Sequence, residues 1–400
     1  MRTEVFAHPL SFRRAPRTQA ERLRATGVDR VRLAYAYHGG RWLLTTSDPA
    51  AVVDFPAGRW FTPEEGSSPD AGPSLPVLGD EATTATSALT ASGVAVTAWL
   101  VGLHQSGPAT AHPGLALRNA FGHRYRHALC PAQPDVVRYA AGLVAETAGR
   151  PGVSGLELEA FGYLGWQHQS AHDKYGADLR PADRWLLSLC FCTACSVRCA
   201  RVGIDTAEAA ARTRKALQDQ LADARPARGI GEDAVAALGR ELHDALLAVR
   251  SEVTTDLVRA TTAAARGLPV SVRATADPYA CDGKSSGDLD ALARTAGSLT
   301  VTSLSGDGAA LFRDLAAAGR TGAHVTAGWH LGAQCTDSEE QLREIAGWAR
   351  SHGAGALALY AYDLAPAPRL EWLRRLPGAA ATGDPVASER PHDAQTEPAR

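Results

Sequence analysis

The sequence predicts an α/β protein: a (β/α)8 TIM barrel of eight parallel strands, with a helical, cysteine-containing insertion after strand four. Short runs rich in β-branched and aromatic residues alternate with helical patterns, the order typical of a parallel sheet wrapped by helices. The chain has 400 residues and contains eight such strand runs. Barrels of this class need about 250 residues before insertions, so the length accommodates all eight units.

Each predicted strand is a short apolar run bounded by turn residues. In chain order the strands are Glu4–Pro9, Asp29–His38, Val94–Val101, Gly152–Ala160, Leu268–Thr275, Ser298–Leu304, His324–His330 and Gly355–Tyr362. The helices predicted between them are Gln19–Thr26, Ala82–Ser92, Asp135–Ala148, Asp288–Ala296, Ala309–Ala318 and Ser338–His352.

The residues in excess of a plain barrel gather after the fourth strand, in 161–266. Two long helices are predicted there, one opening with the cap pattern Asp205-x-x-Glu208 and one running from about Asp233 to Gly267. The second helix carries an apolar stripe that either covers the barrel or joins a neighbouring subunit in a homo-oligomer. The stripe consists of Val235, Leu238, Leu242, Leu246, Val249, Val253 and Leu257.

These patterns predict one barrel domain over 1–376 that includes the insertion. Residues 377–400 have no apolar periodicity and are predicted to form a disordered tail.

Composition argues against several classes of partner. The 41 basic and 43 acidic side chains give a net charge of -2, which lacks the cationic excess that drives binding to nucleic acids. The apolar run at the N-terminus is too short for a signal peptide, and no stretch is long and apolar enough to span a bilayer. We therefore expect a cytoplasmic protein, in which clustered thiols are more often metal ligands than disulfides.

Four of the seven cysteines crowd into the segment LCFCTACSVRCA. Cys190, Cys192 and Cys195 have the spacing of a zinc knuckle, and a tetrahedral Zn²⁺ needs a fourth ligand. Cys199 lies four residues further on, and Cys130 lies in a Cys-Pro turn before the third helix. The spacing alone leaves both candidates open.

The order of motifs around these cysteines resembles the zinc cluster of bacterial β-galactosidases of glycoside hydrolase family 42 and of related barrel glycosidases. The matching region covers roughly a quarter of the chain and contains His112-Pro113, Leu117-Arg118-Asn119, Gly122 and Leu129-Cys130-Pro131, then GLELEA and CFCTAC.

This resemblance implies that Cys130, Cys190, Cys192 and Cys195 bind one zinc ion, which leaves Cys199 spare. Four thiolates leave no open coordination position, so such a zinc is structural.

The resemblance also implies an enzyme that acts on a carbohydrate or glycoside. Barrel active sites lie at the C-terminal ends of the strands, and alternation puts Glu157 and Glu159 on the inner face of strand four, with Glu159 nearer the mouth. In the family, the general acid/base is a Glu at the end of this strand, which implies Glu159. Arg273 on strand five is placed to compensate Glu157, because a buried carboxylate must be paired.

The sequence departs from the family at two points. Leu stands before Glu159, where the β-galactosidases carry Asn, and Trp-His ends the seventh strand, where they carry a nucleophilic Glu. Asp277 and Asp363 follow the fifth and eighth strands and are the candidates for the second catalytic group. Capping of the following loop is the alternative role for each.

Aromatic and polar side chains recur at the predicted strand ends, a combination that suits a sugar site because rings stack on sugar faces. The predicted substrate-binding residues are His8, Tyr37, His38, Trp99, His104, Glu157, Tyr163, His172, Asp173, Arg273, Trp329, His330 and Tyr360. Trp166, His168 and Tyr362 are further candidates at the mouth, and Tyr35 is expected on the same face as Tyr37.

Two other functions stay open. The missing carboxylate on strand seven favours a catalytically inactive barrel that binds a sugar or a partner protein. His168 and His172 share a helix face in the motif His-x-x-x-His, which is compatible with a metal-dependent hydrolase. The sequence contains no glycine-rich phosphate loop, G-x-S-x-G motif or Rossmann fingerprint, which argues against kinases, α/β-hydrolases and dinucleotide enzymes.

Overall fold

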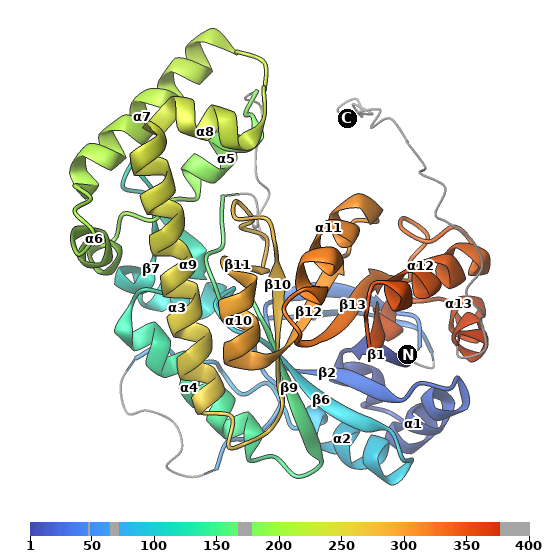
Figure 1. The fold of residues 1–400 in the computed structure, drawn as a ribbon. Helices are drawn as coiled ribbons and strands as arrows, with labels where there is room; N and C mark the ends of the chain where they lie inside the picture. Colours follow the sequence, from blue (N-terminus) through green and yellow to red (C-terminus); the bar gives the residue numbers. More distant parts are fainter. Residues whose placement is uncertain (47–48, 65–71, 167–177, 377–400) are drawn as a thin grey trace, which may run out of the picture.

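A computed structural model describes residues 1–46, 49–64, 72–166 and 178–376, and the predicted tail lies outside them. Eight parallel strands follow one another in the order β1-β14-β13-β12-β10-β9-β6-β2, and β2 pairs with β1 to close the ring (Figure 1). The predicted (β/α)8 barrel is confirmed.

Every barrel strand overlaps the run predicted for it. The eight are β1 (Arg2–Ala7), β2 (Arg30–Tyr37), β6 (Ala95–Val101), β9 (Val153–Glu159), β10 (Val270–Thr275), β12 (Gly297–Ser303), β13 (His324–His330) and β14 (Ala356–Tyr360). Shorter strands lie in the connections: β3 (Gly40–Leu44), β4 (Ala51–Phe55), β5 (Gly58–Arg59), β7 (Ala116–Arg118), β8 (Arg124–Leu129) and β11 (Ser285–Ser286).

Helices alternate with the barrel strands. They are α1 (Pro16–Ala25), α2 (Glu81–Ala91), α3 (Ser106–Ala111), α4 (Pro134–Ala148), α5 (Pro181–Leu187), α6 (Thr193–Ala200), α7 (Thr206–Asp223), α8 (Ile230–Leu238), α9 (Arg240–Ala263), α10 (Leu289–Ala296), α11 (Gly308–Gly319), α12 (Glu339–Ser351) and α13 (Ala367–Trp372). Short 3-10 turns include η1 (Pro9–Phe12) and η3 (Tyr362–Leu364). None of these helices has both the length and the apolar character that crossing a membrane requires.

In the described part of the chain between β9 and β10, there are five helices, α5 to α9. In Figure 1, α5, α7 and α8 stand beyond the rim of the barrel, and α9 runs from them back along its outer wall. The lower part of α9 packs on α4 and α10, where Val249, Val253 and Leu257 are buried. The part of the predicted apolar stripe that lies on α9 therefore packs against the outer helices of the barrel, whereas Val235 and Leu238 lie on α8.

The helix predicted from about Asp233 to Gly267 is two helices. Gly239 has a φ of 79°, a left-handed backbone that residues with a Cβ rarely adopt, and it ends α8 and precedes α9. The predicted cap of α7 is present, since the Asp205 carboxylate accepts hydrogen bonds from the backbone N–H groups of Ala207 and Glu208.

A bulge in β2 separates two tyrosines that simple alternation places together. The register with β6 passes from Ala34–Trp99 to Ala36–Leu100, so β2 uses one extra residue. The Tyr35 hydroxyl lies 2.6 Å from Thr86 Oγ1 on α2, on the helix side of the strand. The expectation that Tyr35 shares the inner face with Tyr37 is therefore wrong.

Charged side chains of alternating sign run up the inside of the barrel, from Glu4 through Arg32, Glu157 and Arg273 to Glu159. Arg32 Nε lies 2.8 Å from a Glu4 carboxylate oxygen, and the same guanidinium contacts Glu157. Arg273 lies 3.0 Å from Glu157 and 2.7 Å from Glu159. We call these five residues the charge ladder.

The lower four members of the ladder are buried, with side chains at most 5% exposed, whereas Glu159 is 15% exposed. Unpaired charges are expensive in such an interior, and each guanidinium here contacts two carboxylates. Arg32 bridges Glu4 on β1 and Glu157 on β9, and Arg273 on β10 contacts Glu157 and Glu159 on β9. Hydroxyl groups add donors, since Thr300 bonds Glu157 Oε2 at 3.3 Å. The ladder therefore couples strands on opposite sides of the ring and supports Glu159 at its upper end.

We expect Glu157→Gln to lower the free energy of unfolding by about 3 kcal/mol, because Arg32 and Arg273 lose a shared buried counter-charge. Urea denaturation followed by circular dichroism measures the change. Glu21→Gln, at an exposed position on α1, is the matched control and should shift the value by less than about 0.5 kcal/mol. Equal effects of the two substitutions would contradict a stabilising ladder.

Candidate functional site

Glu159 is the last residue of β9 and lies at the C-terminal mouth of the barrel. Its Oε2 atom accepts a hydrogen bond from Trp99 Nε1 at 2.6 Å and an ion pair from Arg273 Nη1 at 2.7 Å. None of the described residues donates to Oε1. The carboxyl group is thus held in one orientation by two neighbouring strands and stays partly open to solvent.

Aromatic rings from three strands surround this carboxyl. The Tyr37 ring lies edge-on to Trp99 at 4.9 Å, and Trp99 lies edge-on to Tyr360 at 6.1 Å. The hydroxyl groups of Tyr37 and Tyr360 are 3.3 Å apart. Burial raises the pKa of Tyr360 to about 12 and that of Tyr37 well above its usual value, so both phenols are neutral hydrogen-bonding groups.

A hairpin, β3–β4, lies against these rings. Trp42 on β3 is 5.6 Å from Tyr37, and Phe55 on β4 stacks on His8 at 4.5 Å. Burial, followed by the charges of His38 and Arg13, lowers the pKa of His8 to about 3, so its imidazole is neutral. Its Nδ1 atom accepts the backbone N–H of Leu10 at 3.3 Å. The His8 side chain is therefore packed in the wall of the mouth and has a structural role there.

Three further predicted histidines also lie at the mouth. The His38 ring is 4.2 Å from Tyr37 and 4.6 Å from His104, and the His330 ring is 5.4 Å from Tyr360. Burial lowers the pKa of His330, and its Nδ1 atom accepts the N–H of Gly332 at 2.8 Å. The structure thus brings seven of the predicted residues together through ring contacts at the mouth: His8, Tyr37, His38, Trp99, His104, His330 and Tyr360.

Several predicted substrate-binding residues lie elsewhere. Glu157 is fully buried and paired with Arg273, as the sequence predicts, and also with Arg32. It therefore does not reach the mouth surface, where it was also predicted to bind substrate. Trp329 precedes His330, and alternation turns it outward, where its indole donates to Thr336 Oγ1 at 3.0 Å. These side chains are structural groups, which corrects the prediction.

Two tyrosines after the strand ends also point away. The Tyr163 hydroxyl lies 3.4 Å from Cys195 Sγ, because the chain after β9 leads toward the cysteine cluster. The Tyr362 hydroxyl donates to Gln19 Oε1 at 2.6 Å, on α1. The backbone N–H of Trp166 bonds Ser188 Oγ at 2.9 Å. His168, His172 and Asp173 lie outside the described residues.

The two aspartates considered as a second catalytic group are held in other contacts. Asp277 Oδ1 accepts the N–H of Tyr279 at 2.9 Å, a turn within its own loop. Asp363 is fully buried and accepts hydrogen bonds from Ser11 Oγ and from the His8 backbone N–H. Burial raises the pKa of Asp363 to about 7. Both carboxyl groups are thus engaged in hydrogen bonds of their own, and the pairing of either one with Glu159 stays a prediction.

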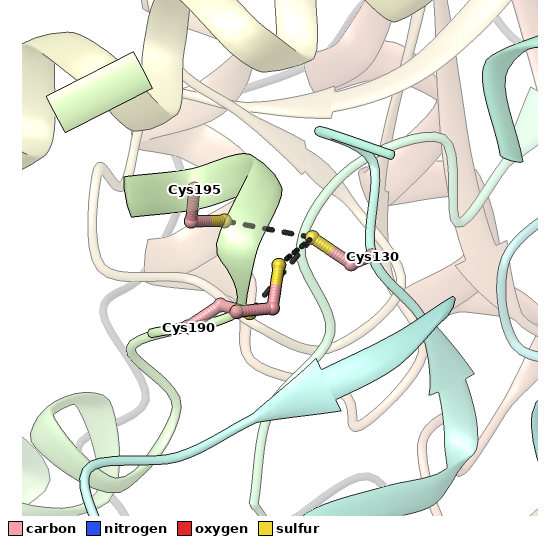
Figure 2. Close-up of side chains that lie close together, drawn as sticks. Cys130, Cys190 and Cys195 are labelled. Carbon is pink, nitrogen blue, oxygen red and sulfur yellow. Dashed lines mark hydrogen bonds between the residues drawn. The ribbon is translucent and has the colours of Figure 1, made fainter. Parts of the chain in front are cut away.

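The second candidate site is the cysteine cluster. Cys130 follows β8, and the other three thiols come from the turn before α6 and from its first helical turn (Figure 2). The sulfur atoms of Cys130, Cys190, Cys192 and Cys195 all lie within 4.8 Å of one another. Cys199 is buried and is not part of this group.

The spacing of these sulfurs fits a tetrahedral metal ion. Cys130 Sγ lies 3.5 Å from Cys195, 3.6 Å from Cys192 and 3.8 Å from Cys190. Zinc–thiolate bonds of about 2.3 Å place the corners of a tetrahedron about 3.8 Å apart, whereas a disulfide needs about 2.05 Å. The donor set is therefore compatible with a metal held between the barrel and the helical segment.

Burial and mutual hydrogen bonds shift the pKa values of the thiols in the cluster. Burial raises the pKa of Cys130 well above its usual value, and hydrogen bonds from neighbouring thiols lower that of Cys192. Donors also point at the sulfurs, since the Arg118 N–H lies 3.3 Å from Cys190 Sγ. A bound cation would displace the remaining thiol protons and hold all four groups as thiolates.

We expect Cys195→Ser to abolish stoichiometric metal binding and to lower the melting temperature, because the tetrahedral set is incomplete. Metal analysis of the purified chain and thermal melting with and without a strong chelator measure both effects. Cys199→Ser is the matched control and should retain the metal. Loss of metal in the Cys199 variant, or no metal in the wild type, would contradict this assignment.

Asp363 should make the protein less stable as the pH rises. Its folded pKa of about 7 exceeds the usual value of 3.8, so its stabilising contribution is complete below about pH 4 and is lost as the pH passes 7. Asp363→Asn should flatten this dependence by about 2 kcal/mol between pH 5 and 8, measured by urea denaturation. Parallel profiles for wild type and variant would show that the carboxyl titrates normally.

No family model matches this sequence, and no curated protein sequence matches it either. Solved structures of several glycoside hydrolases share its fold. A β-galactosidase from the psychrophilic Marinomonas ef1 aligns with a TM-score of 0.58 at 12% identity, over 94% of this chain and 59% of that one. This chain therefore spans less than two thirds of that enzyme's length.

Two catalytic domains match over nearly their whole length. The PgaB (BpsB) glycoside hydrolase domain from Bordetella bronchiseptica aligns with a TM-score of 0.57 at 16% identity, over 94% of this chain and 98% of that one. The β-amylase catalytic domain from Paenibacillus polymyxa aligns with a TM-score of 0.56 at 12% identity, over 94% and 97%. At these identities the likeness shows that the chain has the barrel fold of glycoside hydrolases.

Proposed function

We propose that this protein is a glycoside hydrolase-like barrel that acts on a carbohydrate or glycoside at its C-terminal mouth, with Glu159 as general acid/base. The observation that carries the proposal is the partly exposed Glu159 carboxyl, held at the end of β9 among Trp99, Tyr37 and Tyr360. Barrel enzymes place their chemistry at this face of the ring.

The geometry gives each neighbour a role. Trp99 and Arg273 fix Oε2, which leaves Oε1 to exchange a proton with a glycosidic oxygen or to accept a bond from a sugar hydroxyl. The rings of Tyr37 and Tyr360 offer apolar faces of the kind on which sugars stack, and their hydroxyls offer hydrogen bonds. Because both phenols and His8 stay neutral, Glu159 is the ionisable group that such a substrate would meet first.

A second candidate is a barrel that binds a sugar without hydrolysing it. It is favoured by the positions of Asp277 and Asp363, which are engaged in a loop turn and in a buried pocket of hydrogen bonds. Glycoside hydrolysis generally uses two carboxyl groups about 5 to 9.5 Å apart. Among the described residues, Glu159 is the carboxyl group in contact with the aromatic side chains of the mouth.

We propose in addition that the metal of the cysteine cluster is zinc in a structural role. Four thiolates favour zinc and leave no position for a water or substrate. The cluster joins the end of β8 to α6, so the ion would fasten the helical segment to the barrel.

Glu159→Gln tests the catalytic role. We expect the variant to fold, to bind sugar and to hydrolyse a panel of alkyl glycosides and disaccharides, whose leaving alcohols need protonation, at least about 100-fold more slowly than wild type, because Gln cannot transfer the proton. Glu21→Gln should retain full activity. An equally active Glu159 variant would overturn the assignment, and sugar binding by a wild type that cleaves no member of the panel would favour the second candidate.

A further inference from the structure

The charge ladder ends in an acid at the open mouth. From the bottom of the barrel its signs alternate, and Glu4 at the lower end contacts two more guanidinium groups, Arg2 at 3.5 Å and Arg30 at 3.8 Å. At the upper end, Arg273 is the guanidinium that contacts Glu159 among the described residues, and that arginine is shared with Glu157. The lower end therefore has surplus positive charge near solvent, and the charge nearest a ligand at the mouth is negative.

Two of the histidines described at the mouth add no positive charge near pH 7. Burial lowers the pKa of both His8 and His330, which leaves these imidazoles neutral near pH 7. Arg273, the nearest cation, is 3% exposed and lies below Glu159. His38 is partly buried, and its Nδ1 atom lies 2.8 Å from the Gly39 carbonyl oxygen. A ligand that approaches the mouth thus meets a carboxylate before it meets any guanidinium.

The aromatic rings near Glu159 also favour a positively charged ligand. Aromatic faces attract cations, and Trp99 already has the Arg273 guanidinium 5.5 Å from its ring centroid on the interior side. Tyr360 is partly exposed and lies beside both Trp99 and His330. A carboxylate flanked by aromatic rings is the arrangement with which proteins bind ammonium groups.

We propose that the mouth selects a sugar that carries a positively charged amino group, with the ammonium placed between the Glu159 carboxylate and the Tyr360 ring. This inference rests on the proposed function in its second form, a barrel that binds a sugar without hydrolysing it, because an ammonium paired with Oε1 occupies the oxygen that a general acid needs. The ammonium would add a positive charge above Glu159, the next sign in the alternating series of the charge ladder. It would also supply Glu159 with a counter-ion on its solvent side.

The test compares three monosaccharides that differ at one position: glucosamine, N-acetylglucosamine and glucose. Ligand-observed NMR titration of the full chain near neutral pH measures each affinity. We expect glucosamine to bind about tenfold more tightly than the two neutral sugars, and the ratio to fall as sodium chloride is added. Glu159→Gln should bring the ratio close to one, and Glu21→Gln should leave it unchanged.

The outcomes separate the two proposals. If the wild type binds all three sugars equally and Glu159→Gln weakens all of them, the inference fails and the sugar site stands. If none of the three sugars binds, both the inference and the proposed sugar site are overturned. The wild-type ratio alone decides the inference, so the result does not depend on how well the Glu159 variant folds.

Discussion

The alternating ion pairs inside the barrel are the constraint on which the rest of the structure depends. Four of the five ionisable side chains are removed from bulk water, and they are stable there because their neighbours carry the opposite charge. Arg32 and Arg273 each bridge two carboxylates, so the strands that carry them cannot shift register without breaking two pairs. The charge ladder also fixes the position of Glu159 at the mouth, because Arg273 below it forms an ion pair with its carboxylate.

Burial governs the chemistry of the mouth above the ladder. It keeps Tyr37, Tyr360, His8 and His330 neutral, and so makes the ladder's last carboxylate the dominant charge. The same rings that exclude water also hold the β3–β4 hairpin, through Trp42 and Phe55. The mouth thus combines one carboxylate, that of Glu159, with apolar aromatic walls. Such a site suits recognition of a polar ligand by a small number of groups.

The cysteine cluster and the mouth are separate sites that are connected through the chain after β9. In the proposed zinc site, the metal would fasten the segment between β9 and β10 to the barrel. Tyr163, just after β9, contacts the cluster through its hydroxyl group and Cys195 Sγ. Arg250 on α9 lies over the Tyr163 ring at 4.3 Å, so the long helix also packs against this connection. The end of β9 is thereby held from inside by the ladder and from outside by the cluster.

The sequence by itself determined the eight strands, the helices between them and the cysteine knuckle, because these depend on local periodicity and spacing. It also placed Glu157 and Glu159 on one face, since alternation along a regular strand is a local property. It did not show the bulge that turns Tyr35 outward or the break at Gly239. Nor did it distinguish Asp363, buried under Ser11 and His8, from an aspartate at the mouth. Arg32, Trp42 and Phe55 were missed because their roles come from contacts between residues far apart in the chain, and only the tertiary structure decides such contacts.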